Sequence, residues 1–466
     1  MPISCLVGRS RFLPMASHLD AGNLKIEIED LELTSKVDAL VNHARETGSM
    51  LEAMRAAYGS TSFRYPLGEG PKHLVVLYTD LEPDDILACA QILAWKADVN
   101  ELGKEPIYIS CFDFKHKDGG TVFEKKQLMA SLALGDLNWH QLTFEGDEGD
   151  SRDYEGRLHP KTGDLAKARS AELDAICDEL VKFDGSQIDF YVMAPGHGNI
   201  GAIVAQLKRR SQWPLKNRWQ VSMYTGSFNT RGMTQDDLQA LGEIMKCSDF
   251  PLVDMSKFPF FGGAECLKST ASLATFSKPD FVPKLLRSKP MFAAAWKSFN
   301  DEFNVGLVHP DNSSLFKGSP LTPDEFSRFA VLKEEFARTG VNAYARALMS
   351  DEGLWSKVVN YKKQTVATFA GNACDSPLCD QLLFFYEWLL KNDPSVLAGT
   401  TTGTWSLDPK TGFTKITDAE EAAEGILGIQ PFLKDPKNEE TLVRLQSAAE
   451  DYFFRHLRSL QHSVAD

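Results

Sequence analysis

Residues 73–95 read HLVVLYTDLEPDDILACAQILAW, and this stretch decides the fold class. Its first six residues form a continuous apolar run, polar residues follow, and ILACAQILAW (86–95) carries apolar residues at helical spacing. Continuous apolar runs are typical of strands that are buried on both faces. The stretch therefore predicts a buried strand, a polar loop and a helix.

The same order recurs along the chain. Further strands are predicted at 106–112, 188–194, 219–225 and 251–255, and helices at 123–134, 165–183, 200–208 and 234–247. Buried strands that alternate with helices predict an α/β fold, a mostly parallel, Rossmann-like sheet with helices on both faces. Because ligands of such sheets bind beyond the carboxyl ends of the strands, we expect function in the loops that follow the strands.

Residues 1–70 are predicted to be a helical N-terminal extension. Thr34 or Ser35 can cap a helix that runs to about Tyr58, and Gly48 leaves open whether this is one helix or two. The Gly- and Pro-containing stretch 60–71 is typical of a linker. The apolar side of the helix is predicted to carry Val37, Leu40, Val41 and Met54.

Residues 71–466 are predicted to form one α/β domain. A helical insertion is expected around 256–370, where no further strand is evident. A helix at 376–391, a hairpin turn at 407–413 and an amphipathic helix at 438–460 complete the predicted elements.

Composition and charge limit the function classes. The chain has 466 residues, 43% hydrophobic and 24% charged, which is typical of a globular protein, and its net charge of −14 argues against a nucleic-acid partner. No stretch approaches the roughly 20 apolar residues that span a membrane. Eight cysteines without a CxxC pair favour a reducing, cytoplasmic location. An organelle transit peptide containing Arg9 and Arg11 is the alternative, and a homo-oligomer stays open.

Four carboxylates follow the first predicted strand, at Asp80, Glu82, Asp84 and Asp85. Like charges held close together raise each other's pKa and cost free energy unless a cation compensates them. Several carboxylates after a buried strand favour a hard cation with oxygen ligands, Ca²⁺ or Mg²⁺. The other interpretation is structural, since Asp84 or Asp85 could simply be the N-cap of the following helix.

Four segments together resemble the inosine-uridine preferring nucleoside hydrolase family. VVLYTDLEPDDILA (75–88) resembles its strand, DxDxxxDD and apolar helix, with Asp80, Asp84 and Asp85 at the last three acidic positions. MAPGHGNI (193–200) resembles its GPLTNIA turn, SFN (227–229) its EFN triplet, and ACDSPLC (373–379) its HDPLA segment. The resemblance covers about residues 72–390.

The resemblance implies metal-dependent hydrolysis of the N-glycosidic bond of a ribonucleoside or related small ribosyl compound. Asp80 would be both the base that activates water and a metal ligand. Further ligands would be Asp85, Asp375 and a backbone carbonyl in the 197–198 turn, at Gly198. Water would attack the anomeric carbon.

The resemblance also implies substrate-binding residues. Asp84 and Asn229 would hold the ribose 2′- and 3′-hydroxyls. The family's histidine before the late aspartate, a candidate for protonating the departing base, is Cys374 here. His197 and His116 could take its place, with His197 in the substrate-binding site, and the other interpretation is that they are simply solvated.

Two other functions stay open. Tyr78, Ser227 and Cys374 replace family residues, so the chain could be a catalytically altered relative that binds a ribosyl ligand in a regulatory role. A Mg²⁺-dependent phosphohydrolase is the third class, and it would need a phosphate-binding lysine at the carboxyl edge of the sheet.

Overall fold

A nine-stranded sheet forms the centre of the computed structural model. Strands run in the order β11-β10-β12-β9-β8-β7-β2-β3-β4, parallel from β12 to β4, while β10 is antiparallel to both of its neighbours. The predicted, mostly parallel sheet is therefore confirmed. The strands are β2 His73–Thr79, β3 Ile107–Ser110, β4 Trp139–Gln141, β7 Gln187–Val192, β8 Arg218–Met223, β9 Leu252–Asp254, β10 Leu397–Leu407, β11 Thr414–Asp418 and β12 Ile426–Leu433.

The structure describes part of the chain, and every statement here concerns that part. It comprises residues 21–63, 65, 72–103, 105–110, 122–142, 151–152, 158–159, 163–194, 198–223, 252–254, 281–308, 310, 315–316, 318–339, 341–358, 380–407, 414–418, 426–433 and 439–463. The predicted helix at 234–247 lies outside these residues.

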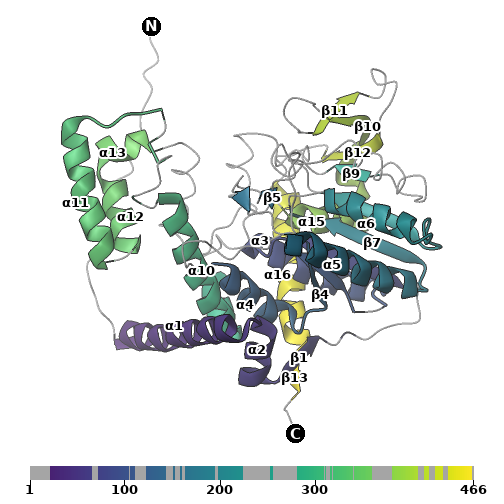
Figure 1. Ribbon diagram of the computed structural model, residues 1–466, viewed down its shortest axis with the longest axis horizontal. Helices are drawn as coiled ribbons and strands as arrows, with labels where there is room; N and C mark the ends of the chain where they lie inside the picture. The colour runs from purple at the N-terminus through teal and green to yellow at the C-terminus, as the bar shows by residue number, and fades with distance from the viewer. Residues whose placement is uncertain are drawn as a thin grey trace.

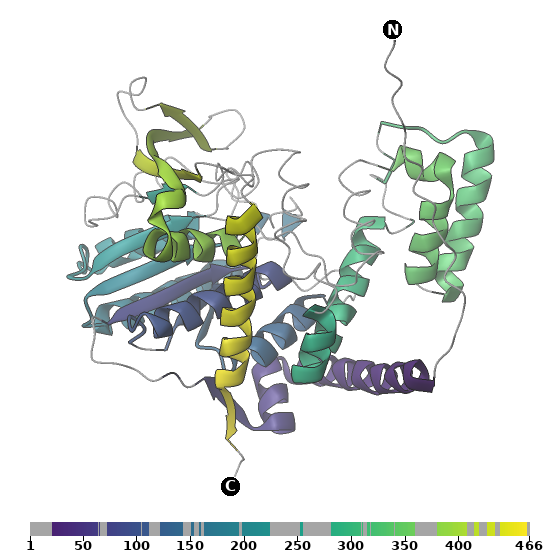
Figure 2. The same ribbon diagram turned by 180° about the vertical axis from the view of Figure 1, so that it is seen from behind.

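Helices cover both faces of the sheet, as predicted. Alternate side chains of β2 belong to two different apolar cores, Val75 and Leu77 to one and Val76 and Tyr78 to the other. Figure 1 shows α5 and α6 on one face, and Figure 2 shows α15 and α16 on the other. The helices against the sheet are α3 Pro83–Asp98, α4 Val122–Leu134, α5 Gly163–Lys182, α6 Gly198–Arg209, α15 Gln381–Asn392 and α16 Glu439–Ser459.

The N-terminal segment differs from its prediction at two points, the start of the first helix and the linker, and of the two alternatives left open at Gly48 it shows two helices. Helix α1 (Ala21–Thr47) starts before Thr34 and Ser35, so neither residue caps it. Gly48, with φ 76°, separates α1 from α2 (Met50–Tyr58), and Ser49 caps α2 by accepting a hydrogen bond from the Glu52 amide. The predicted linker contains β1 (Ser60–Phe63), antiparallel to β13 (Leu460–Ser463). A partner four hundred residues away leaves no local signal for this strand.

The apolar side of these helices was predicted correctly. Val37, Leu40, Val41 and Met54 are buried, in the same core as residues of α3, α4, α10 and α15. The division of the chain at residue 70 stays a prediction.

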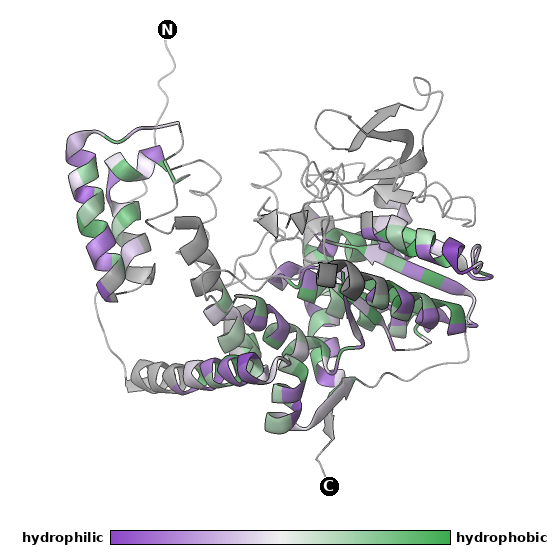
Figure 3. Ribbon diagram, viewed as in Figure 1, coloured by the Kyte–Doolittle hydropathy of each residue, from purple (hydrophilic) through white to green (hydrophobic). Residues whose placement is uncertain are grey.

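Helices also fill the described part of 256–370. They are α9 Phe281–Ser288, α10 Pro290–Val308, α11 Pro323–Thr339, α12 Val341–Ser350 and α13 Glu352–Lys357. The last three enclose a small core of their own that contains Phe329, Tyr344 and Leu354. Hydrophilic and hydrophobic residues alternate along α11 and α12 in Figure 3, as expected of helices with one buried side.

The strands near the C-terminus were not predicted. Leu407 and Thr414, on either side of the expected turn, pair as antiparallel strands, and residues 408–413 of that turn lie outside the described part of the chain. Strand β10, LAGTTTGTWSL, has no continuous apolar run. Strand β12 contains Pro431, and a proline usually indicates an edge strand or a segment that is not a strand. No described helix is apolar over the length needed to cross a membrane.

Candidate functional site

The site begins where the buried strand β2 ends. All seven residues of β2 are buried, and α3 starts at Pro83 after the short loop Asp80–Glu82. Leu81 in this loop has φ 61°, a conformation that side-chain-bearing residues rarely adopt, and its amide donates a hydrogen bond to Thr79 Oγ1 at 2.9 Å. The tight turn brings the first carboxylates of α3 back beside the end of β2.

Three buried aspartates converge at this edge of the sheet. Asp84 and Asp85 lie in the first turn of α3, and Asp380 directly precedes α15. One carboxylate oxygen from each residue lies within 4.8 Å of the other two. The side chain of Asp380 makes no capping hydrogen bond with its own helix, and it acts to lower the pKa of Asp84. Three buried carboxylates are a donor set that fits a hard divalent cation.

The structural interpretation of the aspartates is not the observed one. The N-cap position of α3 is Glu82, without a side-chain cap, and Asp84 and Asp85 lie inside the first turn. Neither aspartate is therefore the N-cap residue, and the reason for their burial lies elsewhere.

Asp85 is the best-anchored member of the cluster. Thr79 Oγ1 donates a hydrogen bond to Asp85 Oδ1 at 2.7 Å, and the Asp80 amide donates to the same oxygen at 3.2 Å. The carboxyl groups of Asp80 and Asp85 also interact, and this interaction acts to raise the pKa of Asp80 and to lower that of Asp85. Asp80 and Asp85 thus form a coupled pair within reach of Asp84.

The electrostatics of the cluster favour a bound cation or bound protons. Burial, followed by repulsion from Glu82 and Asp80, raises the pKa of Asp84 to about 8. Burial and repulsion from Asp84 raise the pKa of Asp85 to about 7, and burial and Asp85 hold the pKa of Asp80 well above its usual value. Ionised together, these groups destabilise the fold, and a cation would compensate them.

A buried lysine partly offsets this charge. Lys126 of α4 is 1% exposed, and its Nζ lies 3.1 Å from Glu82 Oε1. Burial opposes the charged form of Lys126, but Glu82 and Asp80 outweigh burial and raise its pKa. Lys126 is thus a resident cation beside the aspartates, with its charge directed at Glu82.

Replacing Lys126 by Met should therefore destabilise the cation-free protein. Breaking a buried ion pair costs about 3–5 kcal/mol, and because Glu82 is partly exposed we expect about 2 kcal/mol. Urea unfolding in EDTA measures the change, and adding Glu82→Gln should recover most of it. Lys36→Met, which removes an exposed ion pair with Glu32, should cost much less stability, because solvent screens that pair. An equal loss in both single variants would contradict the assigned role.

The residue at the first acidic position of the motif faces the opposite core. Tyr78 is fully buried, and its hydroxyl accepts a hydrogen bond from Asn199 Nδ2 at 2.9 Å. Asn199 lies in the first turn of α6, which begins at Gly198. This contact ties the start of α6 to the end of β2 without adding a carboxylate to the cluster.

Gly198 starts α6, and its role as a backbone ligand stays a prediction. The remaining predicted site residues, His116 among them, are outside the described part of the chain. Asp375, Asn229 and His197 lie there, as do Ser227 and Cys374. Their assigned roles stay predictions.

Sequence reasoning missed three residues of this site, namely Asp380, Thr79 and Lys126. Cys379-Asp380 repeats the Cys-Asp pair at 374–375 directly before the apolar helix, and this repeat was an available signal. Lys126 lies in the polar run EKKQ (124–127) of a predicted helix, where a lysine is usually exposed, so the sequence carries no signal for its burial. Thr79 carries no such signal, because a threonine at the end of a strand is ordinary.

The fold and the site together define a class of protein, an α/β protein with an acidic, cation-compatible site at the carboxyl edge of a parallel sheet. Two solved structures are similar to it: the type III effector protein XopQ complexed with adenosine diphosphate ribose, and the effector protein XOO4466. Each has a TM-score of 0.40 and 12% sequence identity, covering 84% of this chain and 95% of the other. A likeness of this degree concerns the fold at most and carries no argument about ligand or activity. No family model and no curated protein sequence matches the chain.

Proposed function

We propose that the protein is a cation-dependent hydrolase of an N-ribosyl bond, acting on a ribonucleoside or a related small ribosyl compound. The observation that carries the proposal is the convergence of Asp84, Asp85 and Asp380 at the carboxyl edge of the sheet. The resemblance of residues 75–88 to the nucleoside hydrolase signature supplies the reaction class. The cation would be Ca²⁺, with Mg²⁺ as the alternative.

Asp84, Asp85 and Asp380 would hold the cation. When bound, such a cation lowers the pKa of water and attracts a substrate oxygen. Asp80 would accept the proton of the attacking water at its carboxylate, which the cation would keep ionised against the effects of burial and of Asp85 on its pKa. The water oxygen would bond to the anomeric carbon as the carbon–nitrogen bond breaks. The base would leave with the bonding electron pair, and Asn229 and His197 would contact the substrate.

Product analysis tests this proposal. We expect free ribose and free base from at least one member of a nucleoside panel with Ca²⁺, and neither product in EDTA. Asp80→Ala should lose this activity, whereas Asp324→Ala, which removes an exposed acid on α11, should keep it. Equal activity in the wild type and Asp80→Ala would sink the assigned mechanism.

A binding protein with altered catalysis is the second candidate, and Tyr78 favours it. The hydroxyl of Tyr78 bonds to Asn199, so one acidic position of the motif contributes no carboxylate. Calorimetry that finds saturable binding of Ca²⁺ and a nucleoside, with no free ribose released, would favour this candidate.

The phosphohydrolase reading is less well supported. Lys126 does lie at this edge of the sheet, but it is buried and paired with Glu82, and several carboxylates near it repel a phosphate. Phosphate release from a phosphomonoester panel would be the evidence for it.

A further inference from the structure

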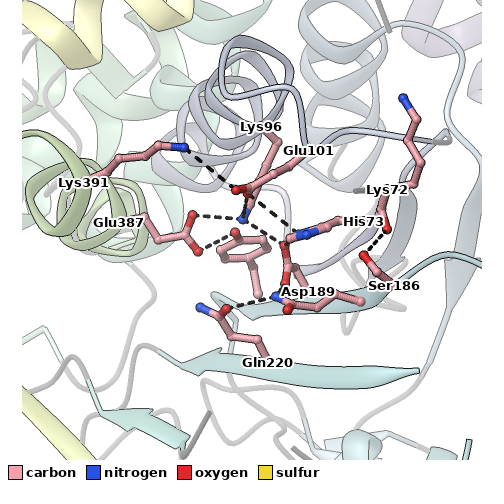
Figure 4. Close-up of polar contacts among 11 residues, drawn as sticks. Lys72, His73, Lys96, Glu101, Ser186, Asp189, Gln220, Glu387 and Lys391 are labelled. Carbon is pink, nitrogen blue, oxygen red and sulfur yellow. Dashed lines mark hydrogen bonds and ion pairs between the residues drawn. The ribbon is translucent and has the colours of Figure 1, made fainter. Parts of the chain in front are cut away.

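A second charged cluster lies at the opposite end of the same elements. Lys96 of α3 is 4% exposed, and its Nζ lies 2.8 Å from Asp189 Oδ2 on β7 and 3.3 Å from Glu387 Oε2 on α15. His73, the first residue of β2, contacts the same Asp189 oxygen at 2.7 Å. Figure 4 shows these side chains from four separate elements turned toward one another. We call Lys96, Asp189, Glu387 and His73 the Lys96 network.

Lys96 already supplies the positive charge that this cluster needs. His73, Glu101 and Asp189 are close enough to share a metal ion, but the ammonium of Lys96 lies 3.1 Å from Glu101 and 2.8 Å from Asp189. Burial alone would lower the pKa of Lys96, yet Asp189 and Glu387 hold it well above its usual value. Lys96 and His73 hold the pKa of Asp189 well below its usual value against the effect of burial. The cluster is a set of buried ion pairs.

Three of the elements that carry the Lys96 network, α3, α15 and β2, also carry residues of the aspartate site. Lys96 follows Asp85 by about three turns of α3, and Glu387 follows Asp380 by about two turns of α15. Residues separated by a whole number of turns lie on the same side of a helix. Asp85 and Lys96 are therefore about 16 Å apart along one side of α3, and Asp380 and Glu387 about 10 Å apart along one side of α15. Strand β2 runs from His73 to Thr79, which anchors Asp85.

The two ends of the α3–α15 contact have opposite electrostatics. At the aspartate end, Asp84 and Asp380 carry like charges when ionised and push the helices apart. At the other end, Lys96 and Glu387 attract each other. The apolar residues between them, such as Leu383 and Phe384, tolerate small shifts of one helix along another, whereas a buried ion pair requires one register.

We propose that Lys96 and Glu387 are positioning residues for the aspartate site, because their ion pair sets the register of α15 against α3 and so the place of Asp380 beside Asp84 and Asp85. The functional meaning of this inference rests on the proposed cation site. Its structural part concerns the start of α15 and is open to measurement without any cation.

The test removes the ion pair while keeping the apolar packing. Glu387→Leu leaves Lys96 paired with Asp189, and adding Tyr191→Phe removes the hydroxyl that donates to Glu387 at 2.6 Å, so that no buried donor is stranded. The matched control is Gln91→Leu, which breaks the link from α3 to the Ala449 carbonyl of α16 and leaves α15 untouched.

Hydrogen exchange in EDTA is the first measurement. In the Tyr191→Phe/Glu387→Leu variant we expect exchange at residues 381–386 to rise about tenfold, with exchange in β2 unchanged and the melting temperature close to that of the wild type. Gln91→Leu should leave exchange at 381–386 as it is. If residues 381–386 exchange in the double variant at the same rate as in the wild type, the inference is overturned.

Calorimetry with CaCl₂ is the second measurement. The double variant should bind Ca²⁺ about tenfold more weakly than the wild type. Removing a residue that supports a metal ligand usually lowers metal affinity about 10–100-fold, and this effect lies at the lower end of that range. Unchanged Ca²⁺ affinity in a folded double variant also overturns the inference. A wild-type protein that binds no Ca²⁺ contradicts the proposed function instead, and the exchange result then decides the positioning role by itself.

Discussion

Asp85→Asn is expected to weaken Ca²⁺ binding more than about 100-fold and at the same time to stabilise the cation-free protein. Removing a residue that hydrogen-bonds to a metal ligand lowers metal affinity about 10–100-fold, and loss of a proposed ligand itself should lower it further. The gain in stability follows because Asp85 is buried, and its charge is repelled by Asp84. A site that costs stability when empty is typical of function and not of packing.

Two titrations separate these effects. Calorimetry with CaCl₂ gives the affinity, and urea unfolding in EDTA at pH 8 gives the free energy of unfolding. Thr79→Val is the companion variant, since it removes the hydroxyl that donates to Asp85 but leaves the carboxylate. It should weaken binding by a smaller factor. If Asp85→Asn destabilises the protein in EDTA and binds Ca²⁺ normally, the carboxylate has a structural role and the proposed site is wrong.

The parallel core was predictable because its signals are local. A strand buried on both faces is a continuous apolar run, and the helix after it has its own spacing, so β2 and α3 can both be found within residues 73–98. The same holds for β3, β7 and β8. Strand β1 escapes this reasoning because its partner β13 lies at the other end of the chain. Strand β10 escapes it because its own residues carry no apolar run.

Only the part of the site that follows β2 was predictable from the sequence. Asp80, Asp84 and Asp85 lie in one loop and its helix, so their proximity follows from the sequence. Asp380 joins them only because α15 packs against α3, a contact between segments about 300 residues apart. The spacing of Lys96 from Asp85 and of Glu387 from Asp380 becomes meaningful only once that contact is known.

The pH dependence of the cation-free protein should run opposite to that of most aspartates. The pKa of Asp84 is about 8 and that of Asp85 about 7 in the folded protein, against an ordinary value of 3.8. The folded state therefore holds these protons more tightly than the unfolded state. The stabilisation is complete below about pH 4 and is lost as pH rises through 7 and 8, at up to about 1.4 kcal/mol per pH unit for each group.

Calcium should reverse this trend, because the cation replaces the protons on the same carboxylates. Its apparent affinity should fall about tenfold per pH unit, for each proton displaced, as pH drops below 7. Calorimetry at pH 7 in two buffers of different ionisation enthalpy should detect proton release on binding. Urea unfolding in EDTA from pH 5.5 to 8.5 should show the loss of stability, and Asp84→Asn/Asp85→Asn should abolish most of it. With pKa values of about 8 and 7, Asp84 and Asp85 must release protons when they bind a cation at pH 7. Ca²⁺ binding without proton release would therefore mean that the cation binds elsewhere.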